Sequence, residues 1–218
     1  MLNKRGICPF FIFCYMPNAK KIKVAITGNI GSGKSTFTKF LFEAGYPVIL
    51  ADDISKEILA GDPEVREEVI KEFGAQSFQG NKINKNFIAD NIFSDTKKLK
   101  IINSILHPRV RKRIDYLSKE YFKTSDIVFV EAALIFESKI EKMYDYVVLV
   151  TADKNLRMKR STISKKFSEA DFIKRDNNQM NEESKKKKAD FIFTNDGSKD
   201  ELKQKAILLI NLLKPTLK

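Results

Sequence analysis

The sequence predicts an α/β fold in which a parallel sheet is flanked by helices. Short apolar runs alternate with helical patterns along the 218 residues. A glycine-rich loop from Gly28 to Ser35 lies between the first apolar run and the first helical pattern. A strand, such a loop and a helix in this order are typical of a P-loop nucleotide-binding sheet. The predicted fold class is a P-loop NTPase-type parallel sheet, with a helical substrate-binding insertion and a helical lid.

Five apolar runs are predicted to form the strands of the sheet. They are Ile22–Thr27, Val48–Leu50, Ile127–Val130, Tyr146–Val150 and Phe191–Thr194. No strand is evident between residues 53 and 125, where the helical spacing after Pro63 indicates an inserted helical subdomain. The last segment, residues 201–213, has its apolar side chains on one face and is predicted to close the sheet as a terminal helix.

This alternation divides the chain into segments with different expected tasks. The nucleotide-binding core is assigned to residues 20–52, 125–154 and 189–218. Residues 53–124 are expected to form the inserted helical subdomain, and the polar, basic residues 155–188 to form a helical lid with a break near Ser168. Residues 1–19 form an N-terminal extension, which is either disordered or reflects a mis-assigned start, with Met16 as the true first residue.

The glycine-rich loop fits the spacing GxxxxGK[ST]. Glycines allow the backbone to aim successive N–H groups at one anion, and the following helix adds the partial positive charge of its N-terminus. Lys34 is predicted to reach the β- and γ-phosphates of ATP, and the Ser35 hydroxyl to bind Mg²⁺. The residues expected to bind ATP here are Gly28, Asn29, Ile30, Gly31, Ser32, Gly33, Lys34, Ser35 and Thr36.

Four acidic residues lie beyond the ends of predicted strands. Asp52 or Asp53 can accept a proton from an attacking hydroxyl or organise Mg²⁺ through water, and capping of the next helix is an equally weighted alternative. Glu131 either supports the metal through water or faces solvent at the strand end. Glu137 is either an acid at the start of a helix or a ligand contact.

The arginines of the polar insertion and the single histidine are further candidates. Arg157, Arg160 and Arg175 carry guanidinium groups that can close over a triphosphate and stabilise the transferring group. His107 precedes Pro108 and is interpreted as a structural turn residue rather than a general base. Substrate binding by His107 is left open.

The composition indicates which binding partners and which cellular location to expect. Its net charge of +12 favours polyanionic substrates such as nucleotides, and its 43% hydrophobic content excludes wholesale disorder. The lysines at residues 185–188 are interpreted as a solvated helix face, so nucleic acid is not favoured as a partner. Cys8 and Cys14 both lie in the first segment, whose apolar run is too short to span a membrane. A reducing, cytoplasmic location is therefore expected.

Seven segments form an ordered set that is far more specific than the P-loop alone. They are Ile26 to Ser35, Ala51 to Ile54, Leu106 to Pro108, Ala133 to Glu137, Arg175 with Gln179, Ala189 with Asp190, and Asn195 to Gly197. This set, in a resemblance that covers nearly everything from about Lys21 onward, resembles the dephospho-coenzyme A kinase family.

The resemblance implies transfer of the ATP γ-phosphoryl group to the ribose 3′-hydroxyl of dephospho-CoA, the final step of coenzyme A synthesis. ATP and dephospho-CoA are then the partners, Mg²⁺ is the cofactor, and residues 53–124 are the CoA-binding domain. The family's general base falls on Asp53, and His107 and Glu137 fall on the substrate side. A monomer is favoured.

The resemblance also places residues around the nucleotide and exposes departures from the family pattern. Asn195 and Gly197 would lie near the adenine of ATP. The first aspartate of the family motif is Ala51 here, and the second lid arginine is Ser164. Arg160 is therefore the better candidate for a catalytic contact in the transition state.

Two other functions are carried as alternatives. The first is a P-loop kinase that phosphorylates another nucleoside or nucleotide. The second is a nucleotide-dependent nucleic-acid-binding protein, which the net charge of +12 motivates.

Overall fold

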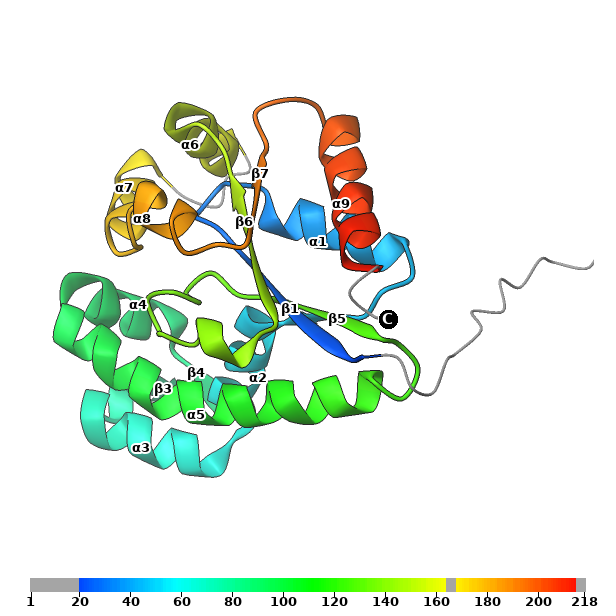
Figure 1. Ribbon diagram of the computed structural model, residues 1–218. Helices are drawn as coiled ribbons and strands as arrows, with labels where there is room; N and C mark the ends of the chain where they lie inside the picture. The colour runs from blue at the N-terminus through cyan, green and yellow to red at the C-terminus, as the bar shows by residue number, and fades with distance from the viewer. Residues whose placement is uncertain (1–19, 164–167, 215–218) are drawn as a thin grey trace, which may run out of the picture.

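The computed structural model describes residues 20–163 and 168–214. The predicted N-terminal extension, residues 1–19, and Ser164 of the lid lie outside the described residues. The described chain forms a central sheet with helices on both faces and a mainly helical lobe beside it (Figure 1). Among these residues, no helix combines the length and the apolar character that a membrane span requires.

The central sheet has five parallel strands in the order β2-β5-β1-β6-β7. The strands are β1 (Ile22–Thr27), β2 (Val48–Leu50), β5 (Ile127–Glu131), β6 (Tyr146–Thr151) and β7 (Phe191–Thr194). Their almost continuously apolar sequences are typical of parallel strands that are covered on both faces. The predicted α/β class is confirmed. Every predicted strand is present, and two of them are one residue longer than predicted.

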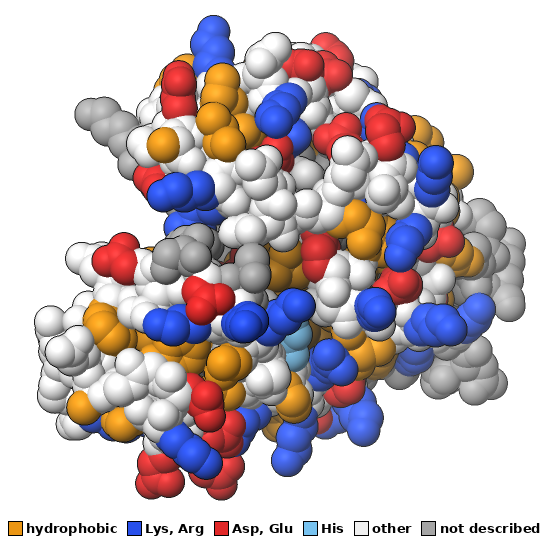
Figure 2. Space-filling view, turned by 90° about the vertical axis from the view of Figure 1, so that its left-hand side faces the viewer, with side chains coloured by type: hydrophobic (Ala, Val, Ile, Leu, Met, Phe, Trp, Pro, Cys, Tyr) orange, Lys and Arg blue, Asp and Glu red, His pale blue; other side chains and the backbone are white. Residues whose placement is uncertain are grey.

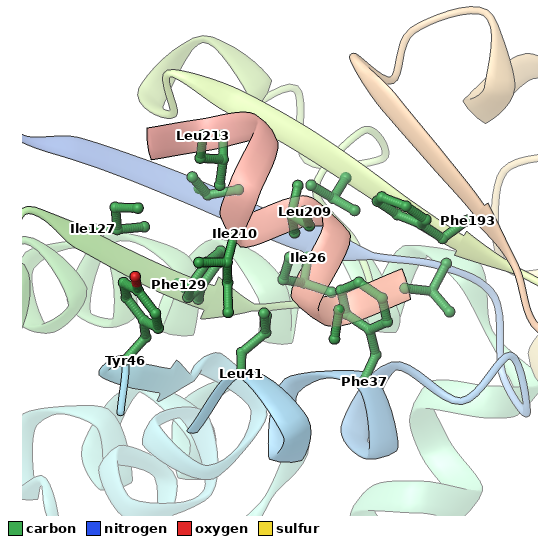
Figure 3. Packing of buried hydrophobic residues seen from close by; sticks show 14 of the residues in the cluster. Ile26, Phe37, Leu41, Tyr46, Ile127, Phe129, Phe193, Leu209, Ile210 and Leu213 are labelled. Carbon is green, nitrogen blue, oxygen red and sulfur yellow. The ribbon is translucent and has the colours of Figure 1, made fainter. Parts of the chain in front are cut away.

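Helices α1 (Lys34–Glu43) and α9 (Lys199–Leu213) cover one face of the sheet (Figure 3). Their buried side chains pack against apolar residues of β1 and β5, and each fully buried leucine or isoleucine contributes ~1.5–3 kcal/mol to stability. The helix residues in this cluster are Phe37, Leu41, Leu202, Ala206, Leu209, Ile210 and Leu213. A capping box between Ser198 and Glu201 fixes the start of α9, which is the predicted terminal helix.

Helices α2 (Ala51–Gly61) and α5 (Thr96–Tyr121) cover the opposite face of the sheet. Ile54 and Ile114 are among the buried residues that they contribute there. Both helices extend beyond the sheet into the helical lobe, which therefore shares two of its helices with the core.

The helical lobe has an apolar core of its own. Helices α3 (Pro63–Phe73) and α4 (Lys85–Ser94) pack with α2 and α5 around a cluster that includes Val69 and Ile102. Asp62 caps α3 by accepting hydrogen bonds from the first backbone N–H groups of the helix. The predicted helical insertion is therefore a compact subdomain with its own buried side chains.

A short hairpin in the lobe corrects one prediction. Strands β3 (Phe78–Gln79) and β4 (Lys82–Ile83) pair antiparallel, although no strand is predicted in this region. Two residues in each strand are too few to produce an alternating pattern. Single turns of 3-10 helix lie at Ala75–Ser77 and Glu141–Met143.

His107 and Pro108 lie inside the 26-residue helix α5, so the interpretation of His107 as a turn residue is wrong. Proline at this position cannot donate a backbone hydrogen bond within the helix. In the turn where the bond is missing, the Arg109 guanidinium donates to the Ile105 carbonyl at 3.0 Å. Arg109 also pairs with Glu68 of α3 at 2.7 Å. Helix α5 continues past Pro108 because it packs on the sheet and on α3.

The described residues of the predicted lid segment form helices α6 (Lys154–Ile163), α7 (Glu169–Asn177) and α8 (Glu182–Lys186). The predicted break near Ser168 is confirmed, because this serine caps α7 by accepting from the backbone N–H of Asp171 at 3.1 Å. The five-residue helix α8 is additional to the two predicted helical pieces.

Candidate active site

The parallel strands bring most of the predicted site residues to one edge of the sheet. The glycine-rich loop follows β1, the two aspartates lie in the first turn of α2 after β2, and Glu131 ends β5. In the register of the sheet, Glu131 lies beside Ile26 of β1 and Leu50 of β2. Open parallel sheets bind their ligands at this carboxyl edge.

The glycine-rich loop is fixed from the side by Asn195, a buried residue that follows β7. Its side-chain amide donates to the carbonyl of Ser32 at 2.8 Å. Gly33 has a φ of +95°, and a Cβ on it would lie only 2.2 Å from the amide nitrogen of Asn195. Only glycine fits between the loop and Asn195. Gly197 lies two residues further on, close to the carboxylate of Glu201.

Lys34 lies at the start of α1 and bends back over the loop. Its Nζ donates to the Asn29 carbonyl at 3.3 Å. Burial lowers the pKa of Lys34, and the negative charges of Glu131 and Asp52 act in the opposite direction. The ammonium group therefore lies between the phosphate loop and the carboxylates at the sheet edge, where an incoming phosphate would meet it.

Glu131 faces the first turn of α1 rather than bulk solvent. The Ser35 hydroxyl donates to its Oε1 at 2.8 Å, and the Thr38 hydroxyl donates to its Oε2 at 2.7 Å. This hydroxyl and carboxylate pair consists of hard oxygen donors, the type that Mg²⁺ prefers. The described residues contain no group of three or more His, Cys, Asp or Glu side chains suited to a metal. Mg²⁺ retains several waters and needs only one or two carboxylates, so this pair fits it.

The two neighbouring aspartates have different surroundings. Neither forms a capping hydrogen bond at the start of α2, so their interpretation as helix caps is not supported. Asp53 pairs with Lys56 one turn further on, at 2.6 Å, and its side chain is 54% exposed. Desolvation raises the pKa of Asp52, which Lys34 lowers and Glu131 raises further. Asp52 therefore belongs electrostatically to the phosphate side of the site, and Asp53 faces outward.

Glu137 holds the lid segment against the core. Its Oε1 accepts the backbone N–H of Met180 at 2.7 Å and lies 2.9 Å from Lys185 Nζ. Lys185 is fully buried, so the interpretation of residues 185–188 as a solvated face is wrong for this lysine. A run of lysines is exposed unless the fold places a carboxylate against one of them. Here Glu137 is that carboxylate, and its distance from Lys185 along the sequence hides the pairing.

The two arginines of α6 occupy different positions. Arg157 is buried, and its Nη1 donates to the Ile30 carbonyl at 3.1 Å and to Asp176 at 2.7 Å. Arg160 donates from Nη1 to the Asn195 carbonyl at 2.8 Å. Arg157 is thus engaged within the protein, whereas Arg160 lies beside the residue that fixes the phosphate loop.

His107 is half-buried on α5, in the lobe rather than at the sheet edge. Burial and the nearby positive charge of Arg111 lower its pKa, which favours the neutral imidazole. The structure does not bring it to the phosphate loop. Its place is compatible with a contact to the second substrate.

The sequence did not predict the contacts of three residues with the phosphate loop or with Glu131. Thr38 follows Ser35 by three residues, so helical periodicity alone could have placed both hydroxyls on the same face. Asp176 carries no comparable signal, because only the fold brings α7 to the loop. Gln179 belongs to the resemblance without a role, and its Oε1 accepts the backbone N–H of Ile30 at 2.8 Å.

Comparisons with known proteins agree with this arrangement. The protein-family model for dephospho-CoA kinase matches residues 22–201. A dephospho-CoA kinase of Bacteroides fragilis is 35% identical over 183 residues, which cover 84% of this chain and 89% of that protein.

Solved structures show the same relationship in three dimensions. A crystal structure from Thermus thermophilus has a TM-score of 0.76 and 30% identity, and the match covers 89% of this chain and 98% of the other. The dephospho-CoA kinase of Campylobacter jejuni has a TM-score of 0.65 and 28% identity, with coverage of 88% and 96%. The sequence resemblance, the shared fold and the edge where the loop meets its carboxylates all indicate one family, and the chain belongs to the dephospho-CoA kinases.

Proposed function

We propose that this protein phosphorylates the ribose 3′-hydroxyl of dephospho-CoA with ATP and thereby makes coenzyme A. Membership of the family is the observation that carries the proposal. The geometry supports it, because the phosphate loop and the carboxylates of Asp52 and Asp53 lie at one edge of the sheet, next to the helical lobe. The reaction breaks the bond between the β- and γ-phosphates and forms a bond from the γ-phosphorus to the hydroxyl oxygen. ADP leaves, and the hydroxyl proton passes to a base.

The phosphate loop is the donor half of the site in this proposal. Backbone N–H groups of residues 28–36 bind the phosphates of ATP, and Lys34 stabilises the charge that moves toward the leaving ADP. Arg160 supplies a guanidinium from the lid side during transfer, and Asn195 and Gly197 line the nucleotide. The contact between Arg160 and Asn195 is consistent with this division of tasks.

Mg²⁺ is the cofactor in the proposal. The Ser35 hydroxyl would bind it directly and Glu131 would support it through water, since the two already share a hydrogen bond. The bound ion neutralises phosphate charge and orients the transferring group. Thr38 holds the second oxygen of Glu131 and so keeps the carboxylate turned toward Ser35.

The first turn of α2 and the helical lobe form the acceptor half. Asp53 accepts the proton of the 3′-hydroxyl, and its side chain is 54% exposed, so an acceptor can reach the carboxylate. Residues 53–124 bind the rest of dephospho-CoA, with His107 and Glu137 on the substrate side. Figure 2 shows a hollow at the level between the lid helices and α4, with Lys and Arg side chains in a band below it. A band of this charge suits an acceptor that carries a diphosphate.

The remaining assignments complete the proposal. Residues 155–188 act as a lid, and Asp52 supplies the charge of the family aspartate that Ala51 replaces. The protein works as a monomer in the cytoplasm. Fractionation of cells and light scattering of the purified protein test these two statements.

A kinase assay with a panel of acceptors tests the proposed function. Purified protein, ATP and Mg²⁺ are incubated with dephospho-CoA, with nucleosides and nucleotides, and with RNA and DNA as binding competitors. We expect ADP release that depends on dephospho-CoA, with coenzyme A as the product detected by mass spectrometry. Phosphorylation of another nucleoside in preference to dephospho-CoA, or tight nucleic-acid binding without kinase activity, would overturn the proposal.

A further inference from the structure

Side chains of the lid segment form hydrogen bonds to the phosphate loop, and the roles proposed above do not account for these bonds. Arg157 of α6, Asp176 of α7 and Gln179 just beyond α7 all contact the loop residues Asn29 and Ile30. We call these three lid residues the clasp. The hydrogen bonds of Arg157 and Gln179 to Ile30 join residues that are 127 and 149 positions apart in the sequence. These contacts therefore form only in the folded chain.

The clasp contains a buried ion pair. The side chains of Arg157 and Asp176 are 4% and 9% exposed, and the two charges meet at 2.7 Å. Arg157 Nε also donates to the Ala152 carbonyl at 3.2 Å, so the guanidinium is bonded on two sides. Burial alone would raise the pKa of Asp176, but the hydrogen bond and charge of Arg157, with smaller contributions from Asn29 and Lys154, hold the pKa below its usual value. Removing either partner would leave a buried charge uncompensated.

The clasp contacts both the backbone of Ile30 and the side chain of Asn29. The N–H of Ile30 donates to Gln179, and its carbonyl accepts from Arg157. The side-chain amide of Asn29 donates to Asp176 Oδ1 at 3.4 Å. A Cβ on Gly31 would lie 2.4 Å from the Arg157 carbonyl, so α6 touches the next loop residue as well. Both backbone groups of Ile30 are thus oriented by the lid segment.

We propose that Arg157 and Asp176 are positioning residues for the nucleotide, which hold Asn29 and Ile30 in the conformation that binds the ATP phosphates. Neither residue contacts the phosphates. This inference rests on the proposed function only in taking ATP as the nucleotide, and it corrects the expectation that Arg157 closes over the triphosphate. Arg157, whose Nε and Nη1 donate within the protein, sets the loop before ATP arrives.

Nucleotide affinity measured without an acceptor is the direct test. Calorimetry with Mg²⁺ and a non-hydrolysable ATP analogue is applied to Arg157→Gln, Asp176→Asn and the double variant. Lys154→Gln is the matched control, because Lys154 lies on α6 at 3.6 Å from the same Asp176 carboxylate but is 61% exposed. Gln179→Ala removes the acceptor of the Ile30 N–H without changing any charge, so it tests the clasp even if Arg157→Gln fails to fold.

The expected result is a Kd for the analogue about 10-fold weaker in Arg157→Gln and Asp176→Asn, and about 3-fold weaker in Gln179→Ala. The double variant should bind about as weakly as the worse single variant, because the two residues act together. Lys154→Gln should bind like the wild type, and the KM for dephospho-CoA should stay within about twofold in all variants.

Three results would overturn the proposal. Lower thermal stability with unchanged nucleotide affinity would show a purely structural ion pair. A reduced kcat with unchanged affinity would show that Arg157 contacts the transferring group itself. Equal weakening in Lys154→Gln would show a general charge effect. Wild-type protein that binds the analogue but does not phosphorylate dephospho-CoA would refute the proposed function and leave the clasp intact.

Discussion

The donor half and the acceptor half of the site are held in different ways. Residues distant in sequence fix the phosphate loop, since Asn195 bonds the Ser32 carbonyl across a separation of 163 positions. Within the part of the chain that the structure describes, Asp53, the proposed base, is bonded to Lys56 of its own helix, and that pair is exposed. The lobe behind Asp53 has a core separate from the clusters that pack on the sheet.

This difference fits the two ligands that the halves are proposed to bind. Phosphate charge is best stabilised by dipoles that need no rearrangement during the reaction, and a loop fixed by buried hydrogen bonds provides them. A bulky acceptor has to enter, settle and leave, which an exposed group such as Asp53 allows. Substitutions on the donor side should therefore impair nucleotide handling, and those on the acceptor side should spare it.

Lys34→Ala should give the largest effect, because it removes the positive charge that faces the phosphates. We expect kcat to fall by about 10³-fold, as the loss of a charge-stabilising donor does in other enzymes. Steady-state kinetics with dephospho-CoA measures it. Lys39→Ala is the control on the same helix, since Lys39 is 69% exposed and pairs only loosely with Glu43. Wild-type kcat in Lys34→Ala would contradict the assignment of the whole loop.

Asp53→Asn should come next and should separate the halves. Loss of the base should lower kcat by about 10²-fold while the KM for ATP stays unchanged. Asp52→Asn is the informative neighbour, because Asp52 interacts electrostatically with Lys34 and Glu131 and should change the KM for ATP instead. If Asp52→Asn loses turnover and Asp53→Asn does not, the base is Asp52 and the assignment made from the family motif is wrong.

Asn195→Ala tests how much the lateral support of the loop contributes. The substitution frees the Ser32 carbonyl and opens a gap beside Gly33, so the loop loses one buried hydrogen bond. The KM for ATP should rise about 5- to 10-fold, equivalent to roughly 1 kcal/mol, with the KM for dephospho-CoA unchanged. The exposed Asn211 of α9 provides the control Asn211→Ala. An equal rise in both KM values would show that the halves are not independent.

Much of the fold follows from local patterns in the sequence. Apolar runs give every strand of the sheet because parallel strands are buried on both faces, and the loop spacing locates the phosphate site. The hairpin of the lobe is missed because two residues per strand leave no periodicity. The helix through Pro108 is missed because packing on both sides outweighs the local preference of proline.

The site is harder to predict from sequence than the fold. In the sequence, Asp52 and Asp53 cannot be told apart by residue type or position. The structure shows that Asp52 interacts electrostatically with Lys34, whereas Asp53 pairs with Lys56. The buried charge of Lys185 is hidden for the same reason, since its partner Glu137 lies far away in sequence. Local patterns identify which residue types are present, whereas their pairing depends on contacts that only the folded chain creates.

His107→Gln should give the smallest effect, and it concerns stability on the acceptor side. Burial and Arg111 lower the pKa of His107 in the folded protein. Between that pKa and the ordinary value near 6.5, the unfolded chain binds a proton that the folded chain does not, so stability rises with pH across this window and falls on acidification. His107 is the only histidine of the chain, which makes the effect separable from other titrations.

Thermal unfolding at pH 7.5 and pH 5.5 measures this contribution. The difference in Tm between the two pH values should be smaller in His107→Gln than in the wild type, because glutamine does not titrate. Kinetics at pH 7.5 should show an unchanged KM for ATP and a modest rise in the KM for dephospho-CoA, since His107 lies in the lobe. An unchanged pH difference would remove His107 as the cause of the acid sensitivity. A raised KM for ATP would mean that the lobe and the phosphate loop are coupled more closely than their separate cores indicate.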